Sequence, residues 1–336
     1  MEHKRMTWLC LVLAMMVMLP SANIIATPQQ EPVEEVVLKV GHIFTATHVA
    51  HRSLEAMAEY VDKETNGGLK LELFPGGQLG KGAKLSENVM LGTVDMATAG
   101  PGLLSRIEPA FAIWGAEFMF TGEEALFKVI KSSVGQEIYE RLRNNHGIRV
   151  VGTGYLGARH LTTSKVPVKT PADLKGLKIR IPNIPYRREA FIAMGAAPTP
   201  MAFQELYLGL QQGVVDGQEN PLQQITSMKF QEVQKYLTLT AHAQNPEMLI
   251  INDEKFASLP KSYQEVLLEG GEVYGDTCRR LFKEEDAKLL EQVKNAGVQI
   301  IEPDLSAFRK AVEDVPAKFE SEWGAGLYER VKEAQK

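Results

Sequence analysis

The amino-acid sequence predicts an α/β protein with two domains. Segments with the pattern of buried strands alternate with segments of helical spacing, and this alternation is typical of a sheet covered by helices. The chain has 336 residues, which is enough for about two domains of ordinary size. Its apolar share of 44% is ordinary, so each domain can bury a core of its own.

Predicted strands and helices already alternate in the first part of the chain. Apolar runs predict strands over 36–40, 69–73 and 94–97. Helical spacing of apolar residues predicts helices over 48–64 and 84–91. A strand, helix, strand, helix, strand order predicts a largely parallel sheet with right-handed crossovers.

The rest of the chain repeats the pattern. Further strands are predicted at 148–151, 177–181, 214–216, 249–251 and 298–301. Further helices are predicted at 186–194, 203–212 and 262–295, with Gly270-Gly271 as a candidate break in the last one. Glycines follow the first two of these helices, as is common at helix ends.

The N-terminus has the layout of a secretory signal peptide. A short basic start precedes an apolar run over 6–19, which is short for a membrane span of about 20 residues. We expect cleavage near Ala26, so that residues 1–26 are removed and the mature chain is exported. An uncleaved membrane anchor is the alternative, because Ile24, at the third position before the cleavage site, is not a small residue.

Charge and cysteine content exclude several classes of function. The formal net charge of −5 argues against nucleic acid or an anionic membrane surface as the main partner. Cys10 lies in the predicted signal peptide, so Cys278 has no second cysteine for a disulfide or a metal site. His48 and His51 lie one helical turn apart without a further ligand at a suitable spacing. We expect two solvated histidines, and neither a metal nor a cofactor.

Catalytic motifs are missing from the sequence. There is no Gly-x-Ser-x-Gly nucleophile elbow, and Gly80-Lys81 lacks the Ser or Thr that follows in a P-loop. An exported lyase acting on organic acids would need a base near the substrate α-carbon, and no motif places one. We therefore predict no catalytic residues and a protein that is not an enzyme.

Arg180 is the strongest candidate for a binding residue. Apolar side chains alternate with it along the predicted strand, so it points away from the core near the carboxyl end of that strand. Ligands of open α/β sheets bind at this end, and an arginine can hold a carboxylate through two parallel hydrogen bonds. A surface arginine paired with a nearby acid is the alternative.

Three other residues allow two interpretations each. Arg159 follows a strand and a glycine-containing turn, and is either a ligand contact or a surface arginine. Asn220 precedes a proline in a polar stretch, where its amide can bind a ligand or satisfy a turn. Phe203 lies one helical turn from Tyr207, and this spacing alone favours a place in the core.

Several segments in series resemble one family. The chain is similar to the solute-binding proteins of tripartite ATP-independent periplasmic (TRAP) transporters over essentially its whole mature length. The segments with the clearest likeness are GARHLTTSK at 157–165, TPADLKGLKIRIP at 170–182, PTPMAFQE at 198–205 and GVVDGQENP at 213–221.

The resemblance implies a two-domain periplasmic binding protein fold, with a cleft, hinge strands and a long domain-spanning helix. Domain I is expected to comprise residues 34–157 and 246–285, and domain II residues 158–245 and 286–336. The ligand is expected to close the two domains around itself.

The resemblance also implies roles for site residues. Arg180 is expected to bind the ligand carboxylate bidentately, Arg159 to add a second cationic contact, and Asn220 to add a hydrogen bond. Phe203 is expected to lie against the ligand. Asn183, which ends the segment that carries Arg180, completes the predicted binding residues.

The implied partners are a small organic acid and a membrane permease. A monomer is expected to capture a sugar acid or a C4-dicarboxylate and deliver it to TRAP membrane subunits. A binding protein that serves a periplasmic sensor or chemoreceptor is the alternative, because its pocket would be the same.

Two departures from the family bear on the ligand. Members that bind sialic acid place acidic side chains in the first domain at positions that match Gly82 and Gly100 here. Because glycine offers no side-chain acceptor, we expect an organic acid other than sialic acid. In addition, Ala116-Glu117-Phe118 stands where many members have a proline before an aromatic residue, which alters a wall of the pocket.

Overall fold

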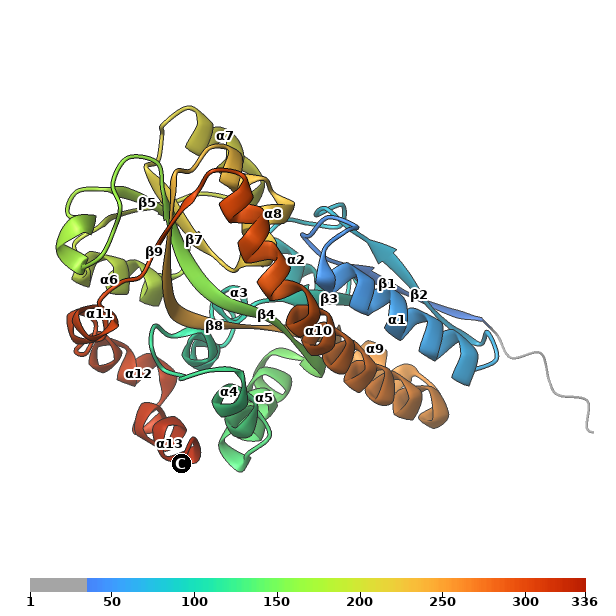
Figure 1. Cartoon of the computed structure of the whole chain (residues 1–336). Helices are drawn as coiled ribbons and strands as arrows, with labels where there is room; N and C mark the ends of the chain where they lie inside the picture. Colours follow the sequence, from blue (N-terminus) through green and yellow to red (C-terminus); the bar gives the residue numbers. More distant parts are fainter. Residues whose placement is uncertain (1–34) are drawn as a thin grey trace, which may run out of the picture. The chain divides into compact units, whose positions relative to one another are not determined.

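A nine-stranded mixed sheet runs through the computed structural model, which describes residues 35–336 (Figure 1). The predicted signal peptide lies outside the described residues. The strands are β1 (Val36–Gly41), β2 (Leu69–Phe74), β3 (Met96–Ala99), β4 (Ile148–Thr163), β5 (Lys178–Ile181), β6 (Ala197–Pro200), β7 (Gly217–Asn220), β8 (Tyr236–Asn252) and β9 (Gln299–Ile301). Their order is β2-β1-β3-β8-β4-β7-β5-β6, and β9 pairs with β8.

The sheet is less parallel than the sequence predicts. Among the described strands β8 is antiparallel to both β3 and β4, and β4 is antiparallel to β7. The remaining pairs are parallel. The antiparallel pairs all involve β4 or β8, whose full length the apolar pattern did not indicate.

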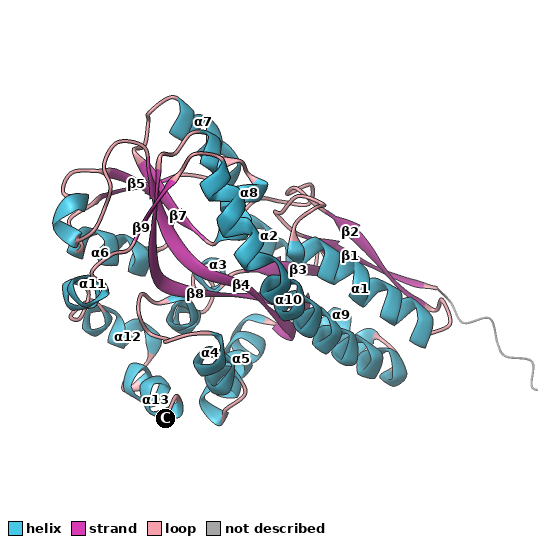
Figure 2. Ribbon diagram, viewed as in Figure 1, coloured by secondary structure: helices cyan, strands magenta, loops and turns pink. Residues whose placement is uncertain are grey.

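Two long strands connect the halves of the sheet. β4 and β8 pair along most of their length, with register shifts near Tyr155 and Arg159. β3 pairs with β8 at Ile251, whereas β7 pairs with β4 at His160 and beyond. Figure 2 shows both strands curving between the two groups of short strands. They are the hinge strands of the expected two-domain α/β fold, which is confirmed, while the domain boundaries stay a prediction.

One long helix packs against this hinge. α10 (Lys261–Asn295) continues through Gly270 and Gly271, so the candidate break does not occur. A Cβ at Gly271 would lie 1.8 Å from the carbonyl oxygen of Val151 in β4. Glycine therefore allows the helix to lie directly on the backbone of the strand, and Figure 1 shows α10 crossing β4.

Shorter helices cover the sheet and form the C-terminus. They are α1 (Val49–Glu64), α2 (Ala83–Met90), α3 (Pro101–Leu104), α4 (Glu123–Ile130), α5 (Ser133–His146), α6 (Pro185–Ala193), α7 (Leu206–Gln211), α8 (Leu222–Ser227), α9 (Asp253–Ser258), α11 (Leu305–Ala311), α12 (Glu320–Trp323) and α13 (Leu327–Ala334). No helix within residues 35–336 combines the length and the apolar character needed to cross a bilayer.

The alternation of side chains along β5 determines which of them face the core and which face the site. Ile179 and Ile181 are fully buried in the apolar core beneath the strand, together with Phe191 of α6. Because side chains alternate across a strand, Arg180 points to the opposite face, as predicted. The predicted strand at 214–216 is wrong, since this segment is a loop. β7 begins at Gly217, so Asn220 lies within the strand.

Candidate functional site

One cavity of about 330 Å³ contains all five predicted binding residues. It is lined from both groups of strands and from the loops that precede α2, α3 and α6. The lining residues that bear on the argument below are Arg159, Arg180, Asn183, Phe203, Asn220, Phe44, Gly100, Arg187, Asn245 and Glu247.

Arg180 presents an uncompensated positive charge to the cavity. It is 3% exposed and forms no ion pair with any described acid. Of its five N–H groups, Nε and one on Nη2 donate to the carbonyl oxygen of Met201, at 3.0 and 2.8 Å. The alternative of a surface arginine paired with an acid is therefore wrong. Burial lowers the pKa of Arg180 to about 10, so it stays charged at neutral pH.

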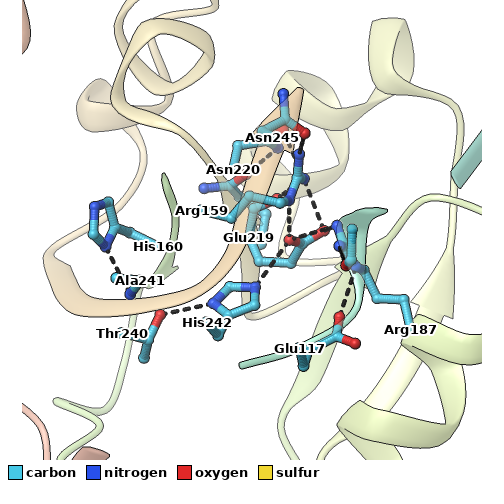
Figure 3. Close-up of polar contacts among 12 residues, drawn as sticks. Glu117, Arg159, His160, Arg187, Glu219, Asn220, Thr240, Ala241, His242 and Asn245 are labelled. Atoms are coloured by element: carbon cyan, nitrogen blue, oxygen red, sulfur yellow. Dashed lines mark hydrogen bonds and ion pairs between the residues drawn. The ribbon is translucent and has the colours of Figure 1, made fainter. Parts of the chain in front are cut away.

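Arg159 lies in the same cavity but its charge is neutralised. Its Nε and Nη2 both donate to the carboxylate of Glu219, and Nη2 also donates to Asn220 Oδ1 at 2.9 Å. Its Nη1 donates to Asn245 Oδ1 at 3.1 Å. In Figure 3 the guanidinium lies between these partners. Arg159 thus offers the cavity a polar surface with little net charge.

The Glu219 carboxylate joins a larger buried network (Figure 3). It accepts hydrogen bonds from Arg187 Nη1 at 3.1 Å and interacts with His242 Nε2 at 3.2 Å. Arg187 donates from Nε to Glu117 at 2.8 Å. Burial alone would raise the pKa of Glu219, but Arg159 and Arg187 hold it well below its usual range. Glu117, noted above as a departure from the family, is therefore the partner of Arg187.

Glu247 is a carboxylate of the cavity outside this network. It lies in β8, is 4% exposed, and forms no ion pair with a described residue. The Thr98 hydroxyl lies beside it but has no hydrogen-bond partner of acceptable geometry. Burial raises the pKa of Glu247 to about 8.

The two flagged histidines are buried, not solvated as predicted. His48 accepts a hydrogen bond from the Ala50 N–H and stacks on Phe44, with ring centres 4.2 Å apart. Phe44 in turn lines the cavity. His51 lies 2.9 Å from His42, measured between ring nitrogens. These histidines support a cavity wall, and no three potential metal ligands gather anywhere in residues 35–336.

Sequence reasoning missed three acidic or basic residues of this site. Glu219 stands inside a polar stretch whose Asn220 alone was assigned, and Arg187 is one of several charges on α6. Glu247 had the clearest signal, because it is a charged residue beside the apolar run that begins at Met248. A charged side chain is rarely buried unless it is paired. At the border of a buried strand it therefore indicates either an ion-pair partner in the protein or a bound ligand.

The chain resembles one family of bacterial binding proteins over most of its length. Residues 40–322 match the family described as bacterial extracellular solute-binding protein, family 7. The 2,3-diketo-L-gulonate-binding periplasmic protein of Escherichia coli is 35% identical over 308 residues, which are 89% of this chain and 92% of that protein. The sialic acid-binding periplasmic protein of Vibrio cholerae is 32% identical over 294 residues, which are 88% of this chain and 91% of that protein.

A solved structure has the same fold. It is a TRAP periplasmic solute-binding protein from Roseobacter denitrificans with bound L-galactonate. The TM-score is 0.84 at 30% identity, and the match covers 90% of this chain and 100% of that chain. The likeness therefore spans nearly all of the described residues.

Proposed function

Since the chain belongs to family 7 of the bacterial extracellular solute-binding proteins, we propose that it captures a sugar acid in the periplasm and delivers it to a TRAP-type permease. Relatives named for, or solved with, 2,3-diketo-L-gulonate and L-galactonate support a sugar acid as the ligand. Export through cleavage near Ala26 and action as a monomer belong to the same proposal. The exclusion of sialic acid stays a prediction, and one relative binds that acid.

The charge state of Arg180 carries this proposal. A buried cation without an acidic partner is costly unless an anion binds beside it. Three of its N–H groups have no described acceptor, and the Phe203 ring centre lies 5.9 Å from its guanidinium carbon. We assign the carboxylate of the ligand to Arg180, with Phe203 against the carbon chain.

The other predicted residues take supporting roles. Asn220 and Arg159 are joined by a hydrogen bond, so they offer the ligand one polar surface instead of a second free cation. Asn183 is exposed at the rim of the cavity. Because the family binds and carries its solutes, we propose no enzymatic activity for this chain.

Titration calorimetry of the purified protein with L-galactonate and 2,3-diketo-L-gulonate tests the proposal. We expect Arg180→Ala and Arg180→Lys to cost about 2–5 kcal/mol of binding free energy, because lysine cannot reproduce the planar guanidinium fork. Arg149→Lys is the matched control, since Arg149 is part-buried and pairs with Asp253 away from the cavity. Normal binding of the ligand by Arg180→Lys would refute the assignment.

A further inference from the structure

The Glu247 carboxylate faces the cavity because position 100 is a glycine. Its Oε2 lies 3.3 Å from the place that a Cβ would take at Gly100. Both residues line the cavity, and no described residue donates a hydrogen bond to this carboxylate. The acceptor that sequence reasoning found missing at Gly100 is therefore supplied by another strand.

Arg180 and Glu247 lie on opposite sides of the cavity lining. Arg180 belongs to β5 and Glu247 to β8, and the strand order places β7 and β4 between them. The polar groups of Arg159, Asn220 and Asn245 come from these two intervening strands and from β8. The cavity thus has the buried Arg180 at one end, a polar and nearly neutral middle, and the Glu247 carboxyl at the other end. The exposed side chains of Lys81 and Arg106 also line it, from the loops beside α2 and α3.

This arrangement matches one class of acid. A chain with a single carboxylate and several hydroxyl groups can bind Arg180 at one end and donate hydroxyl hydrogens to Glu247 at the other. When Glu247 is ionised, a second carboxylate at the far end would meet a like charge, and the two further cations of the lining, Lys81 and Arg106, are solvent-exposed. The oxygens of the buried Glu247 carboxyl also receive no hydrogen bond from a described residue. A ligand with hydroxyl groups can donate these hydrogen bonds and is favoured for that reason.

We infer that Glu247 selects aldonates, which carry one carboxylate and a hydroxylated chain, and that in its ionised form it disfavours the dicarboxylates of the same chain length. The inference rests on the proposed function, because it presupposes that Arg180 holds the carboxylate. Of the two ligand classes left open above, it favours sugar acids over C4-dicarboxylates.

No described cation forms an ion pair with Glu247. Arg159 is the cation that lowers its pKa, but Glu219 already engages the Arg159 guanidinium. The Tyr274 hydroxyl lies 3.5 Å from the backbone oxygen of Glu247 and not at its carboxylate. Selectivity is therefore best measured at pH 8.5, above the pKa of about 8, where the carboxyl is mainly ionised.

Matched acids of equal chain length test the inference. L-Galactonate is compared with galactarate, and D-erythronate with mesotartrate, since each pair differs by a terminal carboxylate in place of a hydroxymethyl group. By calorimetry at pH 8.5 we expect the protein to favour at least one aldonate over its dicarboxylate by 100-fold or more. Glu247→Gln should reduce this preference at least tenfold, because an amide accepts hydrogen bonds without repelling an anion.

Two further variants make the result decisive. Glu108→Gln is the control, since Glu108 is 7% exposed but does not line the cavity, and it should keep the full preference. Gly100→Ala should weaken aldonate binding at least fivefold, because its methyl group displaces the Glu247 carboxylate while its extended backbone accepts alanine. This second variant keeps the test valid if Glu247→Gln does not fold by circular dichroism.

The outcomes separate this inference from the proposed function. Equal binding of aldonate and dicarboxylate, or a preference unchanged in both Glu247→Gln and Gly100→Ala, overturns the inference. If Arg180→Lys still loses binding in that case, capture of a carboxylate by Arg180 stands. If the protein binds no acid of either class, both ideas fail.

Discussion

Arg159 and Arg180 lie in one cavity but differ in what they can do there. Glu219 neutralises Arg159, whereas no described acid accompanies Arg180. The energetic consequence is that only Arg180 gains a new ionic partner when an anion enters. Arg159 instead fixes the orientation of Asn220, whose amide oxygen accepts its hydrogen bond.

The burial of Glu247 predicts a stability that depends on pH. Its pKa is raised from 4.5 to about 8 in the folded protein. The folded state therefore holds a proton that the unfolded chain has released, and this contribution to stability is present below pH 4.5 and lost as the pH rises through 8. At 1.36 kcal/mol per pKa unit the loss is on the order of 5 kcal/mol.

Urea unfolding of the ligand-free protein measures this effect. Glu247→Gln has no ionisable group at this position, so the difference in unfolding free energy between variant and wild type isolates Glu247. We expect this difference to shift in favour of the variant between pH 5 and pH 9. A difference that stays constant over that range would show that Glu247 ionises normally.

Individual side chains were predictable where local pattern decides their direction. Alternation in β5 placed Arg180 on the ligand face, because Ile179 and Ile181 need the core. Nothing local could indicate that Glu219 would neutralise Arg159, since β7 and β4 meet only in the tertiary structure. Burial of His48 was missed although the Phe44 ring that stacks on it lies only four residues earlier, in the loop before α1.

At the scale of elements, the short strands were predicted better than the long ones. β1 and β2 are apolar runs close to their predicted bounds. β4 and β8 were each recognised only at one end, because polar residues such as Arg159 and Glu247 interrupt the apolar pattern where the strands line the cavity. The polar residues that line the cavity are thus the ones that obscure the strand pattern.

The contact between α10 and β4 predicts a strong requirement for glycine. A Cβ at Gly271 would lie 1.8 Å from the Val151 carbonyl oxygen, which is far inside any permitted contact. Overpacking against backbone costs roughly 1–3 kcal/mol or more, which exceeds the gain of about 1 kcal/mol from alanine in a helix. Gly271→Ala should therefore lower the free energy of unfolding by about 2 kcal/mol, which is the upper end of the overpacking cost less the helix gain.

Chemical denaturation checks this prediction against a second glycine. Gly122→Ala is the control, because a Cβ at Gly122 meets no atom within 4 Å and its backbone is extended. The control should unfold like the wild type. Equal stability of Gly271→Ala and wild type would mean that the helix can move away from the strand at no cost.

At the scale of the whole described chain, buried contacts cross the predicted domain boundary. Arg187 of predicted domain II binds Glu117 of predicted domain I, and both side chains are buried. The part-buried Glu285 of α10 binds Gln223 of predicted domain II as well as Arg52 of its own domain. We expect an anion bound at Arg180 to add contacts that favour the approach of the two domains.

This geometry predicts a compaction on binding. We expect small-angle scattering of the ligand-free protein to give a larger radius of gyration than the same protein saturated with L-galactonate, because hinge opening separates the domains. Arg180→Ala, which lacks the ligand anchor, should keep the larger value at the same galactonate concentration. An unchanged radius in the wild type at saturation would refute closure.

The length of α10 gives the hinge a mechanical consequence. The helix has 35 residues and spans roughly 52 Å at 1.5 Å per residue. Its glycine contact with β4 lies at Gly271, about 36 Å from the last residue, Asn295. A rotation of about 10° at that contact moves the far end by about 6 Å. Under the proposed function, such a rotation would move the far end of α10 when the cavity is occupied, and a membrane partner could sense this movement without touching the acid.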